Sequence, residues 1–423
     1  MLGLMLLVRT QEVQGQYGYV TNADGSSYAY STNADGTLAI DDYSGPPWVV
    51  TIPTKINGLN VSVISGGSFA ENTNLSSVTI PGTVGTIGYS AFFSCPNLTN
   101  ATLSNGVTNM LAGAFGECYS LSSMTFPCSL TSIGEFAFDL DTNLSSIAIP
   151  NGEANIAYAA FWHCTSLSSV MIPATVVSIG DEAFFGCTNI SAIMVDPENS
   201  MYSSLGGVLF DKTQRSILAY PNARNGAYTI PNNVGVIEEF SFAGSLLTCM
   251  TIPASVTNIG EGAFFLCNSL TNVTIPGSVA VLGYGMFASC ANLQSVFFES
   301  DAPTNIVAGS DLFPIQLFFG DATTTAYYLP GTTGWTNTYQ GVPAVQWNPL
   351  IQTGNGNFGV RNNQFGFDIK GTAAIPIVVE GCTNLANPVW TALTNVTLTN
   401  GLFHFSEPAQ ANSAGRFYRI SSP

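Results

Sequence analysis

The stretch that decides the fold is Leu167–Cys187, LSSVMIPATVVSIGDEAFFGC, because a close copy of it stands at Leu270–Cys290, LTNVTIPGSVAVLGYGMFASC. Aligned on one phenylalanine, further copies extend along the chain in both directions. Successive copies are 23 residues apart up to a long gap after the sixth, and 22 or 23 apart beyond it. The aligned residues are Phe69, Phe92, Phe115, Phe138, Phe161, Phe184, Phe242, Phe264 and Phe287. A fixed period of this length indicates a solenoid, in which each copy is one rung stacked on the next.

Positions within the repeat predict structural roles. In SVTIP (Ser77–Pro81) the two apolar residues alternate with Ser77 and Thr79, as expected of a strand with one buried face. Ile87-Gly88 should turn the chain with the backbone freedom of glycine, and the phenylalanine column should fill the opposite wall. The pattern predicts a leucine-rich-repeat solenoid with one parallel strand per rung and a short helical or irregular convex side.

The periodicity also divides the chain into predicted regions. Two Thr-Asn-Ala-Asp-Gly runs before the array are typical of hairpin turns. After the array the period is lost, and short alternating runs near the end indicate a small all-β module. The regions are a possible signal-peptide remnant at 1–15, an N-terminal β cap at 16–50, the solenoid at 51–298 with one long rung at 190–229, a C-terminal cap at 299–348, and a β module at 349–423.

Composition limits the partners. The chain has 26 acidic and nine basic residues, a formal net charge of −17, and so lacks the cationic surface that neutralises phosphates. We therefore expect no nucleic-acid partner. Met1–Val8 is apolar but follows no positively charged segment; it is either the end of a signal peptide or a chance apolar start. No other stretch approaches the roughly 18 apolar residues of a membrane span.

The array resembles the BspA-like leucine-rich repeat family of bacterial secreted and surface proteins. VTIPTKINGLNVSVISGGSF (Val50–Phe69) is similar to the opening rung of that family, and NSMYSSLGGVLFDKTQRSILAYP (Asn199–Pro221) is similar to its long rung. The final residues, from NLANPVW onward, resemble a C-terminal module of secreted proteins of environmental bacteria. The resemblance implies export and a binding or adhesion role, with no shared ligand and no catalytic residues.

Six of the nine cysteines occupy one repeat position. We interpret this column as buried free thiols that behave as small apolar residues, although disulfides between neighbouring rungs remain an alternative. The pairs would be Cys95–Cys118, Cys164–Cys187 and Cys267–Cys290. Because no Cys-x-x-Cys pair occurs, we expect no metal site, and no sequence motif calls for a cofactor.

Catalytic signals are weak. His163 beside Cys164 invites a nucleophilic pair, but His163 occupies a repeat position that varies between rungs, so we expect no enzyme. His404 alternates with two phenylalanines and should point outward from a strand. GNGNFG (Gly354–Gly359) matches Gly-x-Gly-x-x-Gly without the strand and helix of a dinucleotide site, and is interpreted as a flexible linker.

Two surfaces are candidates for binding. The first is the outward column of the predicted concave strands, which is small, polar and nearly uncharged: Thr79, Thr102, Thr125, Met171, Thr229, Thr251 and Thr274. The second is the long rung, which holds a third of the basic residues: Lys212, Arg215 and Arg224. The preferred hypothesis is a secreted or surface protein that recognises a protein or a glycan. A structural envelope or matrix spacer without a specific ligand is the alternative.

Overall fold

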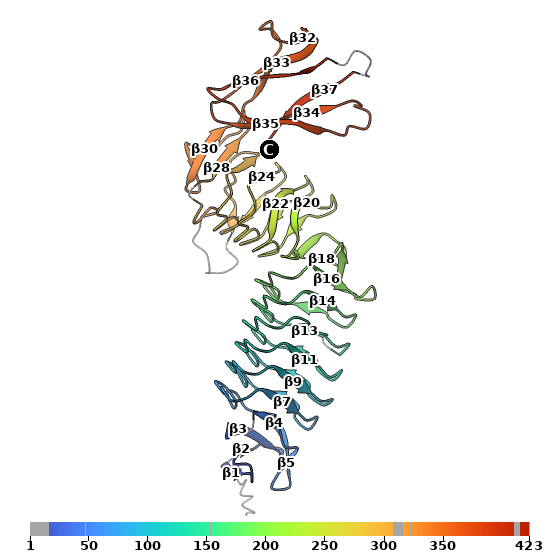
Figure 1. Cartoon of the computed structure of the whole chain (residues 1–423), viewed down its shortest axis with the longest axis vertical. Coiled ribbons are helices and arrows are strands. Elements are labelled where there is room, and N and C mark those ends of the chain that lie inside the picture. Colours follow the sequence, from blue (N-terminus) through green and yellow to red (C-terminus); the bar gives the residue numbers. More distant parts are fainter. Residues whose placement is uncertain are drawn as a thin grey trace, which may run out of the picture. The chain divides into compact units, whose positions relative to one another are not determined.

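The computed structural model describes residues 17–46, 48–152, 154–307, 316–321, 323–409 and 415–422. The proposed signal-peptide remnant lies outside the described residues. The chain forms two compact units, Met1–Ala223 and Arg224–Pro423, each of which is built from β-strands (Figure 1). None of the described segments is a helix that is long and apolar enough to cross a membrane.

The first unit begins with an antiparallel meander that continues into the repeats. The meander consists of β1 (Tyr17–Thr21), β2 (Ser27–Thr32) and β3 (Leu38–Ser44). β3 then pairs in parallel with β6 (Leu59–Ile64), against which β5 (Lys55–Ile56) also pairs. The meander therefore joins the first rung through a parallel strand, as a solenoid cap does.

The repeats of the first unit form two sets of parallel strands, although residues 144–150 form no strand and interrupt the first set. One ladder consists of β4 (Val49–Thr51), β7 (Ser77–Ile80), β9 (Asn100–Leu103) and β11 (Ser123–Thr125), with β14 (Ser169–Ile172) pairing β16 (Ala192–Val195) further along. The other runs from β6 through β8 (Thr86–Ile87), β10 (Asn109–Met110), β12 (Ser132–Ile133), β13 (Asn155–Ile156) and β15 (Ser178–Ile179). The predicted parallel solenoid is confirmed, and a second, two-residue strand is added to the rung.

The long rung ends the first unit. β17 (Tyr202–Leu205), β18 (Val208–Asp211) and β19 (Ser216–Ala219) form an antiparallel meander. The turn between the last two strands is organised by the Asp211 carboxylate, which accepts hydrogen bonds from the backbone amides of Arg215 and Ser216 at 2.6 and 2.7 Å. The excursion is thus an ordered hairpin.

The second unit repeats the two-ladder arrangement. Its longer strands are β20 (Asn225–Thr229), β22 (Leu246–Thr251), β24 (Asn272–Ile275), β26 (Ser295–Phe298), β28 (Thr325–Tyr328) and β30 (Val342–Gln346), and β29 (Thr338–Tyr339) pairs β30. Its short strands are β21 (Val236–Ile237), β23 (Asn258–Ile259), β25 (Val281–Gly283) and β27 (Ile306–Val307).

The end of the second unit is a β module of two small antiparallel sheets. One contains β31 (Leu350–Gln352), β32 (Gly359–Arg361), β33 (Gln364–Lys370) and β36 (Leu402–Pro408). The other contains β34 (Pro376–Cys382), β35 (Thr391–Thr397) and β37 (Phe417–Ser421). The run Gly354–Gly359 is not a free linker, because Asn355 and Asn357 both donate hydrogen bonds to Asp368, at 2.6 and 2.7 Å.

Stacked aromatic rings fill the wall opposite the longer strands. Phe92 is fully buried, and its ring centroid lies 4.8 Å from that of Phe69 and 4.9 Å from that of Phe115. In the second unit the column continues past the predicted residues, since Phe318 stacks on Phe287 at 5.7 Å. Burying one such ring contributes roughly 1.5–3 kcal/mol, so the column is a major source of stability.

Backbone geometry corrects one predicted role. Gly88 does not have positive φ; instead, a Cβ there would lie 2.7 Å from backbone atoms of Ile64 and Gly66 on the preceding rung. Gly134 and Gly180 are equally close to the backbone before them. Glycine is therefore needed at this position because the rungs touch there, and not because the chain requires conformational freedom.

Left-handed residues instead lie two positions before and two positions after each phenylalanine of the column. Around Phe92 these are Ser90 and Ser94, with φ of 50° and 55°. The same pair of positions has positive φ in rung after rung, whether or not glycine occupies them: Gly113 and Glu117, Phe136 and Leu140, Ala159 and His163, Glu182 and Gly186. Each rung thus bends around its buried ring through two left-handed residues.

Candidate functional site

The first predicted binding residues lie side by side on the longer strands of the first unit. Thr79 on β7 pairs in register with Thr102 on β9, and Thr102 pairs with Thr125 on β11. Thr51 on β4 pairs with Thr79 and extends the row at its beginning. The alignment of the repeats did not predict this residue. We call Thr51, Thr79, Thr102 and Thr125 the threonine column. Their strands bury the alternate residues, so the column faces outward.

The hydroxyls of this column are available to a ligand. Within the described residues, no side-chain hydrogen bond engages Thr79, Thr102 or Thr125. The neighbouring hydroxyl row is different, because Thr99 donates to the carbonyl of Ser76 at 2.9 Å, and Ser122 donates to that of Thr99 at 3.2 Å. One row therefore ties rung to rung, while the other leaves its donors and acceptors open.

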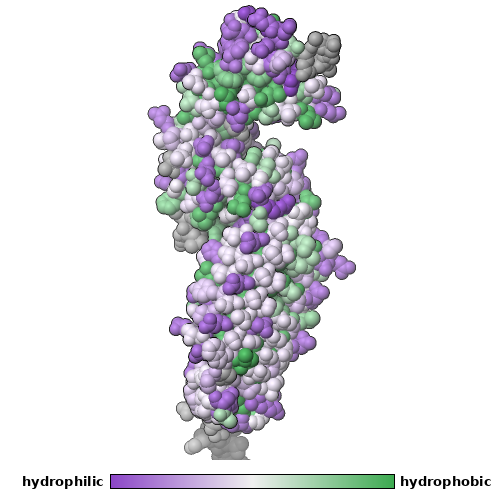
Figure 2. Space-filling view, in the orientation of Figure 1, coloured by the Kyte–Doolittle hydropathy of each residue, from purple (hydrophilic) through white to green (hydrophobic). Residues whose placement is uncertain are grey.

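The column loses its polar character further along the first unit. Met171 on β14 stands in register with Met194 on β16, and both are exposed, at 47% and 42%. Two neighbouring exposed methionines form a small apolar, adaptable surface. Figure 2 shows that the visible surface of the repeats is mostly near neutral in hydropathy, with hydrophilic residues scattered over it.

In the second unit the outward column changes from threonine to aromatic residues. Thr229 pairs with Thr251, and both are exposed. Thr274, however, stands in register with Phe297, and Phe297 in turn with Tyr327. Both rings are almost completely buried, because they pack with the core of the β module.

The predicted basic residues of the long rung are not equivalent. The Lys212 ammonium donates to the carbonyls of Pro197 and Asn199, at 3.1 and 2.5 Å, so it closes the hairpin. Arg215 is exposed at the hairpin turn, and Arg224 is the half-buried first residue of the second unit. Lys212 and Arg215 are both exposed in the first unit's hairpin, but the Lys212 ammonium is engaged by backbone carbonyls.

The cysteine column consists of free, buried thiols. Each thiol donates to the carbonyl of a phenylalanine on the preceding rung; Cys95 bonds Phe69, and Cys118 bonds Phe92, both at 3.1 Å. Burial raises the pKa of the Cys118 thiol well above its usual value, which keeps it protonated. The column therefore supplies packing and rung-to-rung hydrogen bonds.

Two aspartates replace cysteine in this interior column. Asp141, which is fully buried, accepts a hydrogen bond from the backbone amide of Cys118 at 2.8 Å, while its Oδ2 has no partner. Burial raises its pKa well above the usual value of 3.8. Asp321 is likewise buried, and burial raises its pKa to about 7. Both carboxyls are thus held in surroundings that disfavour their charged form.

The two histidines lie in different surroundings. The His163 ring packs against Trp162 and Phe185, at 3.8 and 5.5 Å between centroids, while the Cys164 thiol donates to the carbonyl of Phe138. The two side chains thus have separate partners. His404 points outward, as expected, and its Nδ1 lies 2.6 Å from the Asp368 carboxylate. No cluster of three or more metal-ligating side chains occurs among residues that the structure describes.

The repeat pattern matches a known family. The BspA type leucine rich repeat region, in six copies, covers residues 62–191 and 217–310, together more than half of the chain. The chain belongs to the BspA-type leucine-rich repeat family. Its matched segments include both the threonine column from β7 onward and the strands up to Phe297.

Solved structures share the fold of this BspA-type chain. The pneumococcal vaccine antigen PcpA is 20% identical with a TM-score of 0.58, and the comparison covers 74% of this chain and 94% of that one. A leucine-rich repeat protein from Eubacterium ventriosum is 22% identical with a TM-score of 0.56, covering 78% and 85%. At these identities the likeness shows the fold alone. No curated protein sequence matches the chain.

Proposed function

We propose that the chain is a non-catalytic recognition protein, secreted or held at a bacterial cell surface, whose threonine column binds a protein or a glycan. The observation that carries the proposal is the in-register row of outward threonines whose hydroxyls have no partner within the described residues. Family membership supports a recognition or adhesion role.

The column suits a ligand that offers repeated polar groups. Each hydroxyl can both donate and accept a hydrogen bond, and successive rungs are about 4.8 Å apart. A single such bond contributes only about 1 kcal/mol, so affinity would come from several rungs acting together. Because the column carries no charge, we expect binding to depend little on salt concentration.

The domain organisation has a role in this proposal. In this proposal residues 51–298 would present the column, residues 16–50 and 299–348 would act as its caps, and residues 349–423 would be the β module that packs on the last repeats. The long rung at 190–229 is a second candidate surface, with Lys212 and Arg215 as exposed cations and Arg224 as a half-buried one. Thr229 and Thr251 form a candidate surface of their own in the second unit, whereas the hydroxyl of Thr274, predicted with them, shares a hydrogen bond with Ser422.

The experiment is a retention assay with the immobilised full chain, a printed glycan array and a solubilised bacterial envelope extract. Thr79→Glu combined with Thr102→Glu places two charges in the column. Thr86→Glu, on the short strand β8 of the same rung as Thr79, is the matched control. We expect partners retained by the wild type and the control to be lost by the double variant.

Other outcomes separate the alternatives. Retention that survives in the double variant but is lost in Arg215→Ala would move recognition to the long rung. If neither array nor extract yields a retained partner, the recognition proposal fails and a structural spacer becomes the better account. The spacer hypothesis draws on the regular stacking of aromatic rings and thiols, which would suit a rigid rod.

A further inference from the structure

A pocket lies where the last repeats meet the β module. Its volume is about 340 Å³, and it is lined by Thr274, Phe297, Tyr327 and Trp347 from the repeat side and by the end of β37 with the following Ser422 from the module. We propose that this pocket binds one or two sugar residues of a glycan. The site is separate from the threonine column, and would stand even if that column bound nothing.

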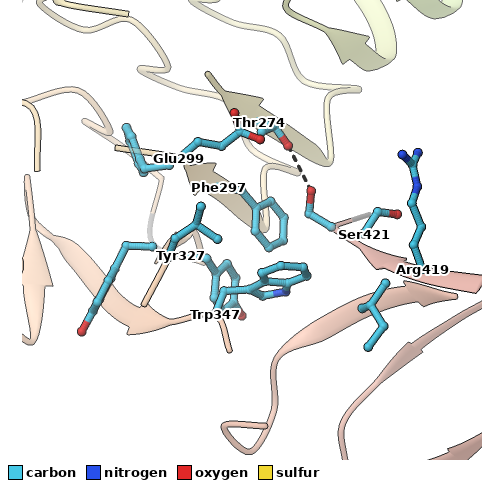
Figure 3. A pocket seen from close by; sticks show the side chains of 12 residues that line it. Thr274, Phe297, Glu299, Tyr327, Trp347, Arg419 and Ser421 are labelled. Atoms are coloured by element: carbon cyan, nitrogen blue, oxygen red, sulfur yellow. Dashed lines mark hydrogen bonds between the residues drawn. The ribbon is translucent and has the colours of Figure 1, made fainter. Parts of the chain in front are cut away.

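Aromatic rings form one wall of the pocket. The rings of Phe297 and Tyr327 are stacked, with centroids 5.0 Å apart and planes 17° apart, and Trp347 meets Phe297 edge-on at 6.0 Å. Figure 3 shows these three rings gathered together at the centre of the pocket. The C–H face of a pyranose ring is apolar and flat, so it can pack against such a wall as another ring would.

Trp347 is the ring best placed to meet a ligand. Phe297 and Tyr327 are only 5% and 8% exposed, whereas Trp347 is half-buried. Its indole N–H donates to the carbonyl of Pro376 at 2.8 Å, which fixes the ring and satisfies its one donor. The exposed part of the side chain is therefore a preoriented apolar surface.

The rim of the pocket carries groups that match sugar hydroxyls. Thr274 and Ser422 share a hydrogen bond at 3.1 Å, which ties β24 to the end of the module. Glu299 is exposed at the rim and offers a carboxylate acceptor. The Arg419 guanidinium is held by Glu380 through a 2.6 Å hydrogen bond and lies 4.5 Å from the Trp390 ring centroid.

Together these features favour a sugar over an apolar peptide side chain. A sugar offers an apolar face to the rings and hydroxyls to a rim that carries the Thr274 and Ser422 hydroxyls and the Glu299 carboxylate. An apolar side chain would use the rings alone. The volume is at the small end of ligand pockets, which fits one or two sugar rings rather than a long chain. The β module then acts as the second half of a binding site.

The test uses the full chain titrated calorimetrically with methyl β-glucoside, methyl β-galactoside, cellobiose, lactose and N,N′-diacetylchitobiose. Trp347→Phe keeps an apolar ring but reduces the ring surface that a sugar can contact. Trp48→Phe is the matched control, because Trp48 is exposed and lies in the first unit. At least one saccharide should bind the wild type. Its affinity should fall about tenfold in Trp347→Phe and stay unchanged in Trp48→Phe, a difference of about 1.4 kcal/mol.

A second variant keeps the test decisive if Trp347→Phe is poorly folded. Glu299 is exposed, so Glu299→Ala should leave the fold intact and weaken saccharide binding severalfold. The proposal is overturned if none of the five saccharides binds, or if binding is the same in both pocket variants as in the wild type. Binding of N-acetyltryptophanamide without any saccharide would also overturn it, in favour of a peptide ligand.

Discussion

The same outward row of side chains is open in one part of the molecule and covered in another. On β7, β9 and β11 it consists of threonines with unengaged hydroxyls, whereas on β26 and β28 it consists of Phe297 and Tyr327, buried against the β module. Both stretches have parallel strands in register. Backbone pairing is therefore alike, and the identity of one side chain per rung decides whether the strand face meets solvent or another part of the chain.

The largest expected effect comes from making the covered stretch resemble the open one. Phe297→Thr removes a buried ring from the junction with the module, and should lower the free energy of unfolding by about 3 kcal/mol. Urea unfolding and limited proteolysis of the β module should both report the loss. The reciprocal change, Thr102→Phe, should alter stability by less than about 0.5 kcal/mol. Equal losses in the two variants would contradict the comparison.

An aspartate occupies the interior column in both stretches, Asp141 on the rung of Thr125 and Asp321 on the rung of Phe297. The pKa of Asp321 is raised to about 7 in the folded protein, above its usual 3.8, so the unfolded chain loses this proton first. The contribution of Asp321 to stability should therefore fall as pH rises from about 4 to about 7. Asp321→Asn should be more stable by about 1–2 kcal/mol at pH 8, with the gain vanishing near pH 4.

Thermal unfolding of both proteins between pH 4 and pH 8 measures this gain. Asp42→Asn, at an exposed aspartate, is the control and should change little at any pH. If the gain in stability for Asp321→Asn is constant between pH 4 and pH 8, the charge on the Asp321 carboxylate does not destabilise the folded protein.

A smaller effect tests whether the two stretches have the same backbone conformation at equivalent positions. Ser94, in the rungs of the open stretch, and Ser289, beside the covered stretch, both have left-handed φ, 55° and 59°. Ser94→Gly and Ser289→Gly should each stabilise the protein by about 0.5–1 kcal/mol, because glycine adopts this conformation without strain. Gly67→Ala, at φ 71° with open space around the added methyl, should destabilise it similarly. Calorimetric melting measures all three; opposite signs for the two serines would refute a common backbone.

The smallest effect concerns the threonine column itself. Thr102→Val removes a hydroxyl that has no protein partner and keeps the β-branched shape that suits a strand. Chemical unfolding should therefore find a change below about 0.5 kcal/mol. A loss above 1 kcal/mol would mean that the hydroxyl stabilises the fold rather than standing free for a ligand.

Much of the fold could be predicted because the repeat is long and frequent. The phenylalanine column and the inward and outward alternation at Ser77–Pro81 follow from positions that recur every 23 residues. The second strand of each rung could not be predicted, since two residues such as Thr86–Ile87 are too few to show a period. The left-handed positions could not be predicted from the sequence either, because residues as different as Phe136 and Gly113 occupy them.

The candidate sites were predicted less completely. Thr79, Thr102 and Thr125 were found because their rungs align without gaps. Phe297 and Tyr327 continue the same register, but 30 residues separate them, so the alignment fails where the row turns aromatic. Trp347 and Arg419 come together only through the packing of the β module, which no pattern in the repeats encodes.

The stacked phenylalanines have a consequence for how such a chain can change in length. Each ring between Phe69 and Phe184 meets an equivalent ring on both sides, so loss or gain of a complete 23-residue copy brings like surfaces together again. Loss of a single residue inside a rung would instead displace the ring, the thiol and the threonine of that rung from their neighbours at once. Inherited variation within this array should therefore come in whole copies.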